Sequence, residues 1–98
     1  MANKMDQAKL LMKARKLQKE LANEIISVEA GEGAVRIEIT GEQKIKKIHI
    51  DPDLIDLDDI GELELWIEKA VREAINQSQQ LAAEKMQPMM GMLGNLGL

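Results

Sequence analysis

The sequence contains no cysteine, no phenylalanine and no tyrosine, and Trp66 is its single aromatic residue. The absence of cysteine excludes disulfide bonds, thiol catalysis and cysteine-ligated zinc. One indole cannot form the row of aromatic side chains on which many proteins stack bases or sugars. Hydrophobic residues still make up 45% of the chain, so Ile, Leu, Val, Ala and Met must fill the core.

Long hydrophobic runs are also missing. No stretch approaches the roughly 18 apolar residues that cross a bilayer, and the N-terminal MANKMDQAKLLMKARK lacks the apolar segment of a signal peptide. We therefore expect a cytoplasmic protein without membrane contact. Its 98 residues predict one domain, close to the size at which a second subunit often supplies additional buried surface.

The formal net charge is −4, but the charged residues are distributed unevenly along the chain. Residues 1–24 carry six basic and three acidic side chains, a net charge of +3. Residues 51–75 carry nine acidic and two basic side chains, a net charge of −7. Only the N-terminal segment is therefore suited to attract a polyanion.

The clearest local pattern is a β-hairpin. Apolar and polar residues alternate over residues 35–40, as in a strand with one buried face, and Gly41 marks a turn. Ile48 and Ile50 continue the alternation in the return strand, so we expect them on the buried face. Pro52 has no N–H to donate and ends the sheet.

One residue of the return strand breaks the alternation. Ile45 falls on the polar face, which predicts either a bulge near Lys46 or a frayed start of the strand. A further strand is expected over residues 25–30, joined to the hairpin by the turn at residues 31–33. Three short strands with tight glycine turns predict an antiparallel meander.

The N-terminal segment is rich in good helix formers as far as about Asn23, with Asn3 as the expected N-cap. One helical stripe is apolar, and it consists of Leu10, Ala14, Leu17 and Leu21. Lys9, Lys13 and Lys16 share a different face, because successive residues rotate by about 100°. We interpret Met5 and Met12 as packing residues.

A second helix is predicted after the sheet. Asp59 and Glu62 have the spacing of a capping box, and one apolar face continues until Pro88, which should end or kink the helix near Gln87. This helix of about 28 residues spans roughly 40 Å, more than a small sheet covers. Its distal half is therefore expected to project and pack against another subunit or partner.

These elements predict an α+β fold in the order α-β-β-β-α, with two long helices flanking a three-stranded meander and dimerisation through the sheet and helices. Residues 1–87 form a single domain in this prediction. Residues 88–98, PMMGMLGNLGL, form a flexible Met- and Gly-rich tail in this prediction.

No catalytic, cofactor or metal site is predicted. The acidic segment DPDLIDLDD fails as a calcium loop, because a loop that starts at Asp56 places Ile60 and Ile67 at two ligand positions. Acidic residues at a helix N-terminus are favoured by the helix dipole alone. His49, the single histidine, has no nucleophile or acid at a recognisable spacing, so an enzyme is not expected.

The basic first helix is the remaining candidate site. Its cations could neutralise phosphates of DNA, and a dimer would present two such helices. The simpler alternative is an ordinary solvated helix face. The candidate DNA-binding residues are Lys4, Lys9, Lys13, Arg15, Lys16 and Lys19.

The order of these parts resembles the YbaB/EbfC family of bacterial nucleoid-associated proteins. The segments that carry the resemblance are MDQAKLLMKARKLQKEL, VEAGEGAVRIEITGEQKIKKIHIDPDLI and LWIEKAVREAINQS, and Ile50-Asp51-Pro52 followed by Leu54-Ile55 is the most specific. The resemblance implies a homodimer with a shared sheet and protruding helices that binds double-stranded DNA with little base specificity. It also implies a link with recombination and repair genes, through which recombination or repair proteins become candidate partners.

Gln79 and Gln80 depart from the family pattern, because relatives often carry basic residues there. We therefore place phosphate contacts on the first helix alone. The leading hypothesis is a homodimeric protein of the cytoplasm and nucleoid that contacts the DNA backbone and affects nucleoid organisation, gene expression, or recombination and repair. The alternative is a protein-interaction adaptor that uses the acidic segment and the Met-rich tail.

Overall fold

The computed structural model describes residues 4–95. Its elements, in chain order, are α1 (Lys4–Asn23), β1 (Ile25–Ala30), β2 (Val35–Thr40), β3 (Ile45–Ile50), the 3-10 turn η1 (Pro52–Leu54) and α2 (Ile60–Asn95). This order confirms the predicted α+β class and the α-β-β-β-α arrangement. The expected N-cap at Asn3 lies outside the described residues.

The three strands form an antiparallel meander in the order β1-β2-β3. Glu38 pairs with Lys47 whereas Ile39 pairs with Ile45, so Lys46 is an extra residue in β3. The predicted bulge is therefore confirmed. By adding one residue, the bulge turns Ile45 to the face of the sheet that carries the core.

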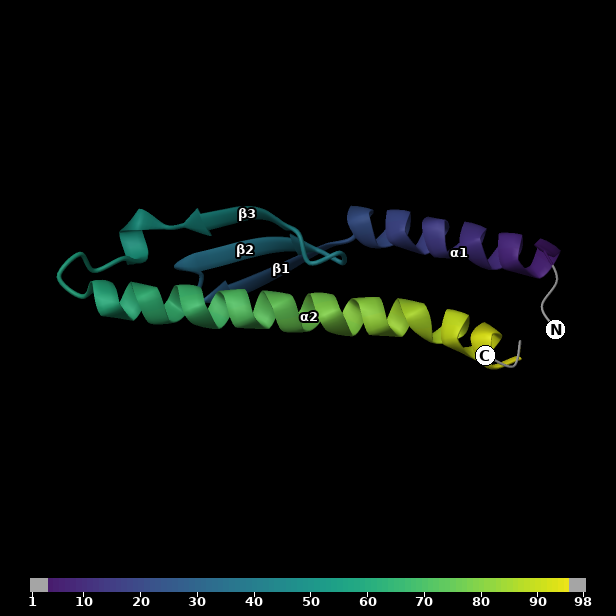
Figure 1. The fold of residues 1–98 in the computed structure, drawn as a ribbon. Helices are drawn as coiled ribbons and strands as arrows, with labels where there is room; N and C mark the ends of the chain where they lie inside the picture. The colour runs from purple at the N-terminus through teal and green to yellow at the C-terminus, as the bar shows by residue number, and fades with distance from the viewer. Residues whose placement is uncertain (1–3, 96–98) are drawn as a thin grey trace.

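Helix α2 runs along one face of the sheet and covers β1 and β2 (Figure 1). The buried side chains of the sheet meet small alanines of the helix, which allow a close approach. This core consists of Val28, Val35, Ile37, Ile39, Ala70 and Ala74. The side chain of every β3 residue is exposed, because the helix does not extend over this edge strand.

Exposure of β3 changes one sequence prediction. Ile48 and Ile50 pair with Ile37 and Val35, so they do lie on the core side of the sheet. They are nevertheless 48% and 38% exposed. The prediction that they are buried is wrong for the single chain, since one helix is too narrow to cover three strands.

Side-chain hydrogen bonds fix the position of α2. The Glu62 N–H donates to Asp59 Oδ1 at 3.2 Å, which confirms the predicted N-cap. Further along, the buried Ser78 hydroxyl donates to the Thr40 carbonyl at 2.7 Å and accepts the Gln43 N–H at 3.1 Å. These last two bonds hold the middle of α2 against the β2–β3 turn.

Of the predicted end or kink near Gln87, the end is wrong, because α2 continues through Pro88 to Asn95. A proline inside a helix removes one N–H donor and crowds the preceding turn. The residues before it are Ala, Glu, Lys, Met and Gln, which are good helix formers, and the helix continues after it although Gly91 and Gly94 follow. Residues 96–98 of the predicted tail lie outside the described part of the chain.

Helix α1 extends beyond the sheet, side by side with the distal half of α2 (Figure 1). Its C-terminal end is anchored by buried Leu21, whose carbonyl accepts the Gly41 N–H at 2.9 Å. A Cβ added at Gly41 would lie 2.8 Å from Leu21 Cδ2, so glycine allows this close contact. The Lys85–Glu24 ion pair, at 3.4 Å, links the same end of α1 to α2.

Candidate nucleic-acid interface

The six predicted DNA-binding residues all lie on α1, and all six side chains are exposed. They are Lys4, Lys9, Lys13, Arg15, Lys16 and Lys19. Only Asp6 and Glu20 oppose them within the helix, which leaves α1 with a net charge of +4. The structure therefore brings the predicted cations together on one element.

The apolar stripe of α1 faces the protein. Leu21 is buried, whereas Leu10, Ala14 and Leu17 are partly buried along the side that contacts α2. The prediction of this stripe from the sequence is confirmed. Because the cations occupy other sides of the helix, they face the surrounding solution.

The cations form two lines along α1 rather than one. At about 100° per residue, Lys9, Lys13 and Lys16 lie on one side of the helix. On the other side, the second line consists of Lys4 and Arg15, whereas Lys19 lies on the outer side of the helix about two turns beyond Met12. On the inner side of α1, the apolar stripe that packs toward α2 lies between the two lines of cations. On the outer side, Met5, Ala8 and Met12 lie between the lines, and we call these three residues the outer strip.

Two methionines occupy this outer strip. Met5 and Met12 are 69% and 70% exposed, so the interpretation of both as packing residues is wrong. The apolar stripe that begins at Leu10 already fills the contact with α2, and the two methionines point away from it. Their seven-residue spacing places them on nearly the same line, because it corresponds to about two turns.

The distal half of α2 adds almost no charge to this end of the molecule. Between Asn76 and Met90 its only charged residues are Glu84 and Lys85, and Lys85 pairs with Glu24 of the chain segment that follows α1. The cationic surface therefore belongs to α1. This agrees with placing the candidate phosphate contacts on the first helix alone.

Carboxylates of the acidic segment before α2 accept hydrogen bonds from backbone N–H groups of the same segment. Asp51 Oδ1 accepts the Asp53 N–H at 3.0 Å, and Asp56 Oδ1 accepts the Asp58 N–H at 2.9 Å. Among residues 4–95, no group of three or more Asp, Glu, His or Cys side chains is arranged to hold a metal ion. Asp51 and Asp56 therefore cap backbone N–H groups two residues further along their own turns.

His49 lies on the outer face of the sheet, opposite Arg36 of β2. It lines a shallow hollow of about 160 Å³ with Arg36, Glu38 and Lys47. His49 is exposed, as expected for a surface residue, and the hollow carries both signs of charge without a serine or cysteine. This group therefore lacks the nucleophile of a catalytic site.

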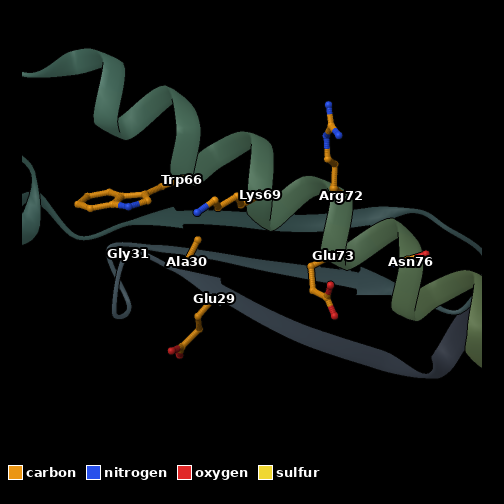
Figure 2. Close-up of a pocket in the computed structure, with 8 residues that line it drawn as sticks. All are labelled: Glu29, Ala30, Gly31, Trp66, Lys69, Arg72, Glu73 and Asn76. Carbon is orange, nitrogen blue, oxygen red and sulfur yellow. The ribbon is translucent and has the colours of Figure 1, made fainter.

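A larger hollow of about 470 Å³ lies between α2 and the end of β1. Figure 2 shows the Trp66 ring lying against Gly31, with the Lys69 side chain directed toward the ring and Arg72 directed away from the hollow. Two charged residues of the lining are paired with residues outside it, since Glu29 pairs with Arg36 at 3.1 Å and Arg72 pairs with Glu68 at 2.6 Å. The indole therefore packs on the turn, a contact that no pattern in the sequence indicated.

An exposed apolar surface beside the sheet was not predicted from the sequence. It consists of Ile45, Ile48 and Ile50 on β3 with Leu57, Ile60 and Ile75 beside or on α2. Ile50 and Leu57 of this surface, together with the half-buried Leu63, help to line a hollow of about 340 Å³. We call these six exposed residues the apolar face. The available signal was that one helix follows three strands and can cover only part of their width.

In the described part of the chain, no helix has the length and apolar composition needed to cross a membrane.

Comparison with known proteins gives one consistent result. The model of the YbaB/EbfC DNA-binding family matches residues 1–93. A nucleoid-associated protein of Ruminiclostridium cellulolyticum is 40% identical, over 98% of this chain and 84% of the relative. One from Chloroflexus aurantiacus is 38% identical, over 84% of this chain and 82% of the relative.

The fold is also found in a solved structure. An uncharacterized protein of Helicobacter pylori superposes with a TM-score of 0.77, covering 92% of this chain and 99% of the other. The two sequences are 16% identical, so this likeness supports the fold.

Proposed function

Because the chain belongs to the YbaB/EbfC DNA-binding family, we propose that α1 binds the phosphate backbone of double-stranded DNA. Membership of a family of DNA-binding, nucleoid-associated proteins agrees with the expectation that the chain is not an enzyme. Nucleoid organisation is the process that such binding would serve first. Effects on gene expression, recombination or repair would follow from changes in DNA access.

One observation supports this proposal above the others. Helix α1 carries six exposed cations on the sides of the helix that its partly buried apolar stripe does not occupy. Phosphate contacts need positive charge but no particular base, so they provide affinity with little sequence preference. Binding through about four to six phosphates would give a slope near −4 to −5 when log K is plotted against log salt.

Reversal of charge at one line of cations tests the site. The triple substitution Lys9→Glu, Lys13→Glu, Lys16→Glu is expected to abolish binding in a mobility-shift titration. The matched control is Lys44→Glu, Lys46→Glu, Lys47→Glu, which changes the net charge equally at exposed positions of the β2–β3 turn and β3. Retained binding by the α1 variant, with its fold intact by circular dichroism, would remove α1 as the interface.

We further propose that a second copy of the chain covers the apolar face. Six large aliphatic side chains, each at least 38% exposed, are gathered beside a sheet that is covered on two of its three strands. Burial of apolar surface contributes about 25 cal/mol for each Å², so pairing of two such faces would be favourable. A symmetric dimer would also present two α1 helices to one duplex.

Sedimentation tests the dimer. The parent protein is expected to sediment as a dimer at micromolar concentration, and Ile48→Glu combined with Ile60→Glu is expected to give a monomer. Ile25→Glu is the control, because Ile25 is 60% exposed but points to the opposite face of the sheet from the core. A monomeric parent, or a double variant that remains dimeric, would contradict this interface.

An adaptor function remains the second candidate. Exposed carboxylates lie with exposed Leu54 and Leu57 at the end of the molecule where α2 begins, as far as possible from α1. Such a mixed surface could bind a basic protein partner. Affinity capture from a nuclease-treated lysate separates the two functions, because only an adaptor retains a stoichiometric protein partner without DNA.

A further inference from the structure

We propose that α1 lies in the major groove of DNA, where Met5, Ala8 and Met12 contact the methyl groups of thymine. This inference rests on the proposed binding of DNA by α1 and adds the groove and the base feature that the helix meets. The relevant surface is the outer strip of α1, between its two lines of cations.

The first observation is the exposure of the strip. Met5 and Met12 are 69% and 70% exposed, and Ala8 between them is also exposed. The two methionines are separated by seven residues, which corresponds to about 10.5 Å along the helix axis. Three base pairs of DNA span nearly the same distance, at about 3.4 Å for each step.

The second observation is the position of the cations. Lys9 and Lys13 flank the strip on one side, and Lys4 and Arg15 flank it on the other. A helix with its side chains is about 10–12 Å wide, which fits the major groove of about 12 Å but not the minor groove of about 6 Å. With the strip toward the groove floor, each line of cations faces the phosphates of one wall.

The chemistry of the outer strip determines which groups of the bases it can contact in the major groove. Methionine and alanine side chains offer neither the paired donors nor the strong acceptors that recognise guanine, adenine or cytosine edges. The apolar feature of the major-groove floor is the C5 methyl group of thymine. Methionine has a flexible, polarisable side chain and can adjust to methyl groups at more than one position, which suits binding with weak sequence preference.

Charge also argues against a second copy of this helix as the occupant. Each α1 carries a net charge of +4, so contact between two outer strips would bring like charges together around both methionines. A polyanion has the opposite effect, because it neutralises the cations on both sides of the strip.

The experiment compares two duplexes that differ only in methyl groups. One contains A·T pairs, and in the other each thymine is replaced by deoxyuridine, which keeps the hydrogen-bonding groups and lacks the methyl. The parent protein is expected to bind the deoxyuridine duplex about three- to ten-fold more weakly, as loss of one or two buried methyl contacts implies.

The double variant Met5→Ala, Met12→Ala is expected to bind both duplexes equally, with the salt slope of the parent. The control Met86→Ala, Met90→Ala removes two exposed methionines of α2 and should keep the parental discrimination. Equal binding of both duplexes by the parent, or discrimination that survives in the Met5/Met12 variant, would overturn the groove assignment. The Lys9/Lys13/Lys16→Glu variant separates this outcome from failure of the proposed function. If the parent binds both duplexes equally and this variant loses binding, α1 contacts the phosphates without reading the methyl groups. If this variant still binds DNA, α1 is not the interface.

Discussion

At position 31, both the backbone conformation and the packing against Trp66 require glycine. The φ of Gly31, +62°, lies in the left-handed region, which side chains other than glycine rarely adopt. A Cβ at this position would also overlap the ring of Trp66. The only aromatic side chain therefore packs directly on the backbone of the β1–β2 turn, and it holds the first part of α2 against that turn (Figure 2).

Gly31→Ala is expected to destabilise the protein by about 2–4 kcal/mol, since backbone strain and steric overlap both act on the folded state. Urea unfolding followed by circular dichroism measures the loss. The same substitution in a Trp66→Leu background should cost only about 1 kcal/mol, because the overlap with the ring is gone. An equal cost in both backgrounds would show that the indole does not restrict this position.

At the scale of elements, α2 has two different environments. Its first half covers β1 and β2, and Ser78 marks the point where it passes the β2–β3 turn. Its second half lies beside α1 and contains Pro88. Proline cannot donate a hydrogen bond to the carbonyl four residues earlier, that of Glu84, so the helix is weakest near this turn.

Pro88→Ala should strengthen the distal half of α2, because it restores one helical hydrogen bond and removes the clash of the proline ring; the gain is up to about 3 kcal/mol for local opening. Hydrogen exchange of the amides that follow residue 84 is expected to slow. Gln87→Ala is the control, since it changes the neighbouring residue without adding a donor. Unchanged exchange in Pro88→Ala would contradict a weak point at this turn.

Features that depend on residues close together in the chain could be predicted from the sequence. Features that depend on which surfaces the helices cover in the folded protein could not. The bulge at Lys46 and the cap at Asp59 follow from local alternation and spacing, and both are present. The exposure of Ile48 and Met12 was missed, because it depends on how much surface one helix covers and on which face of α1 meets α2. The helix end at Pro88 was wrong, because α2 continues to Asn95 in spite of one lost hydrogen bond and of Gly91 and Gly94. The cations of α1 were placed on one exposed helix correctly, and their binding of DNA stays a prediction.

The whole molecule is long and electrically polarised. It measures 65 × 19 × 14 Å, and its radius of gyration of 18.8 Å exceeds the roughly 13 Å of a compact domain of this length. The acidic segment and the start of α2 form one end, and the basic α1 extends to the other (Figure 1). Because salt screens charges beyond about 8 Å at physiological ionic strength, the two ends act independently there.

Neutralisation of the acidic end should therefore leave DNA binding unchanged at 0.15 M salt. Asp53→Asn, Asp58→Asn and Glu64→Gln together change the formal net charge from −4 to −1. Affinity is expected to stay within about two-fold at 0.15 M salt and to rise at 0.01 M, where screening extends to about 30 Å. A several-fold gain at the higher salt concentration would place DNA along the acidic end as well.

The bulge in β3 also has a consequence for how copies of the chain meet. Without Lys46 the strand would read IKIHI and would alternate regularly, so the extra lysine is an insertion that the sheet absorbs within one residue. The row of three isoleucines stays continuous on one face, while the free edge gains an irregular backbone and two adjacent lysines. Such an edge is a poor template for another strand. The same insertion therefore favours assembly through the apolar face and protects the strand against uncontrolled edge-to-edge growth.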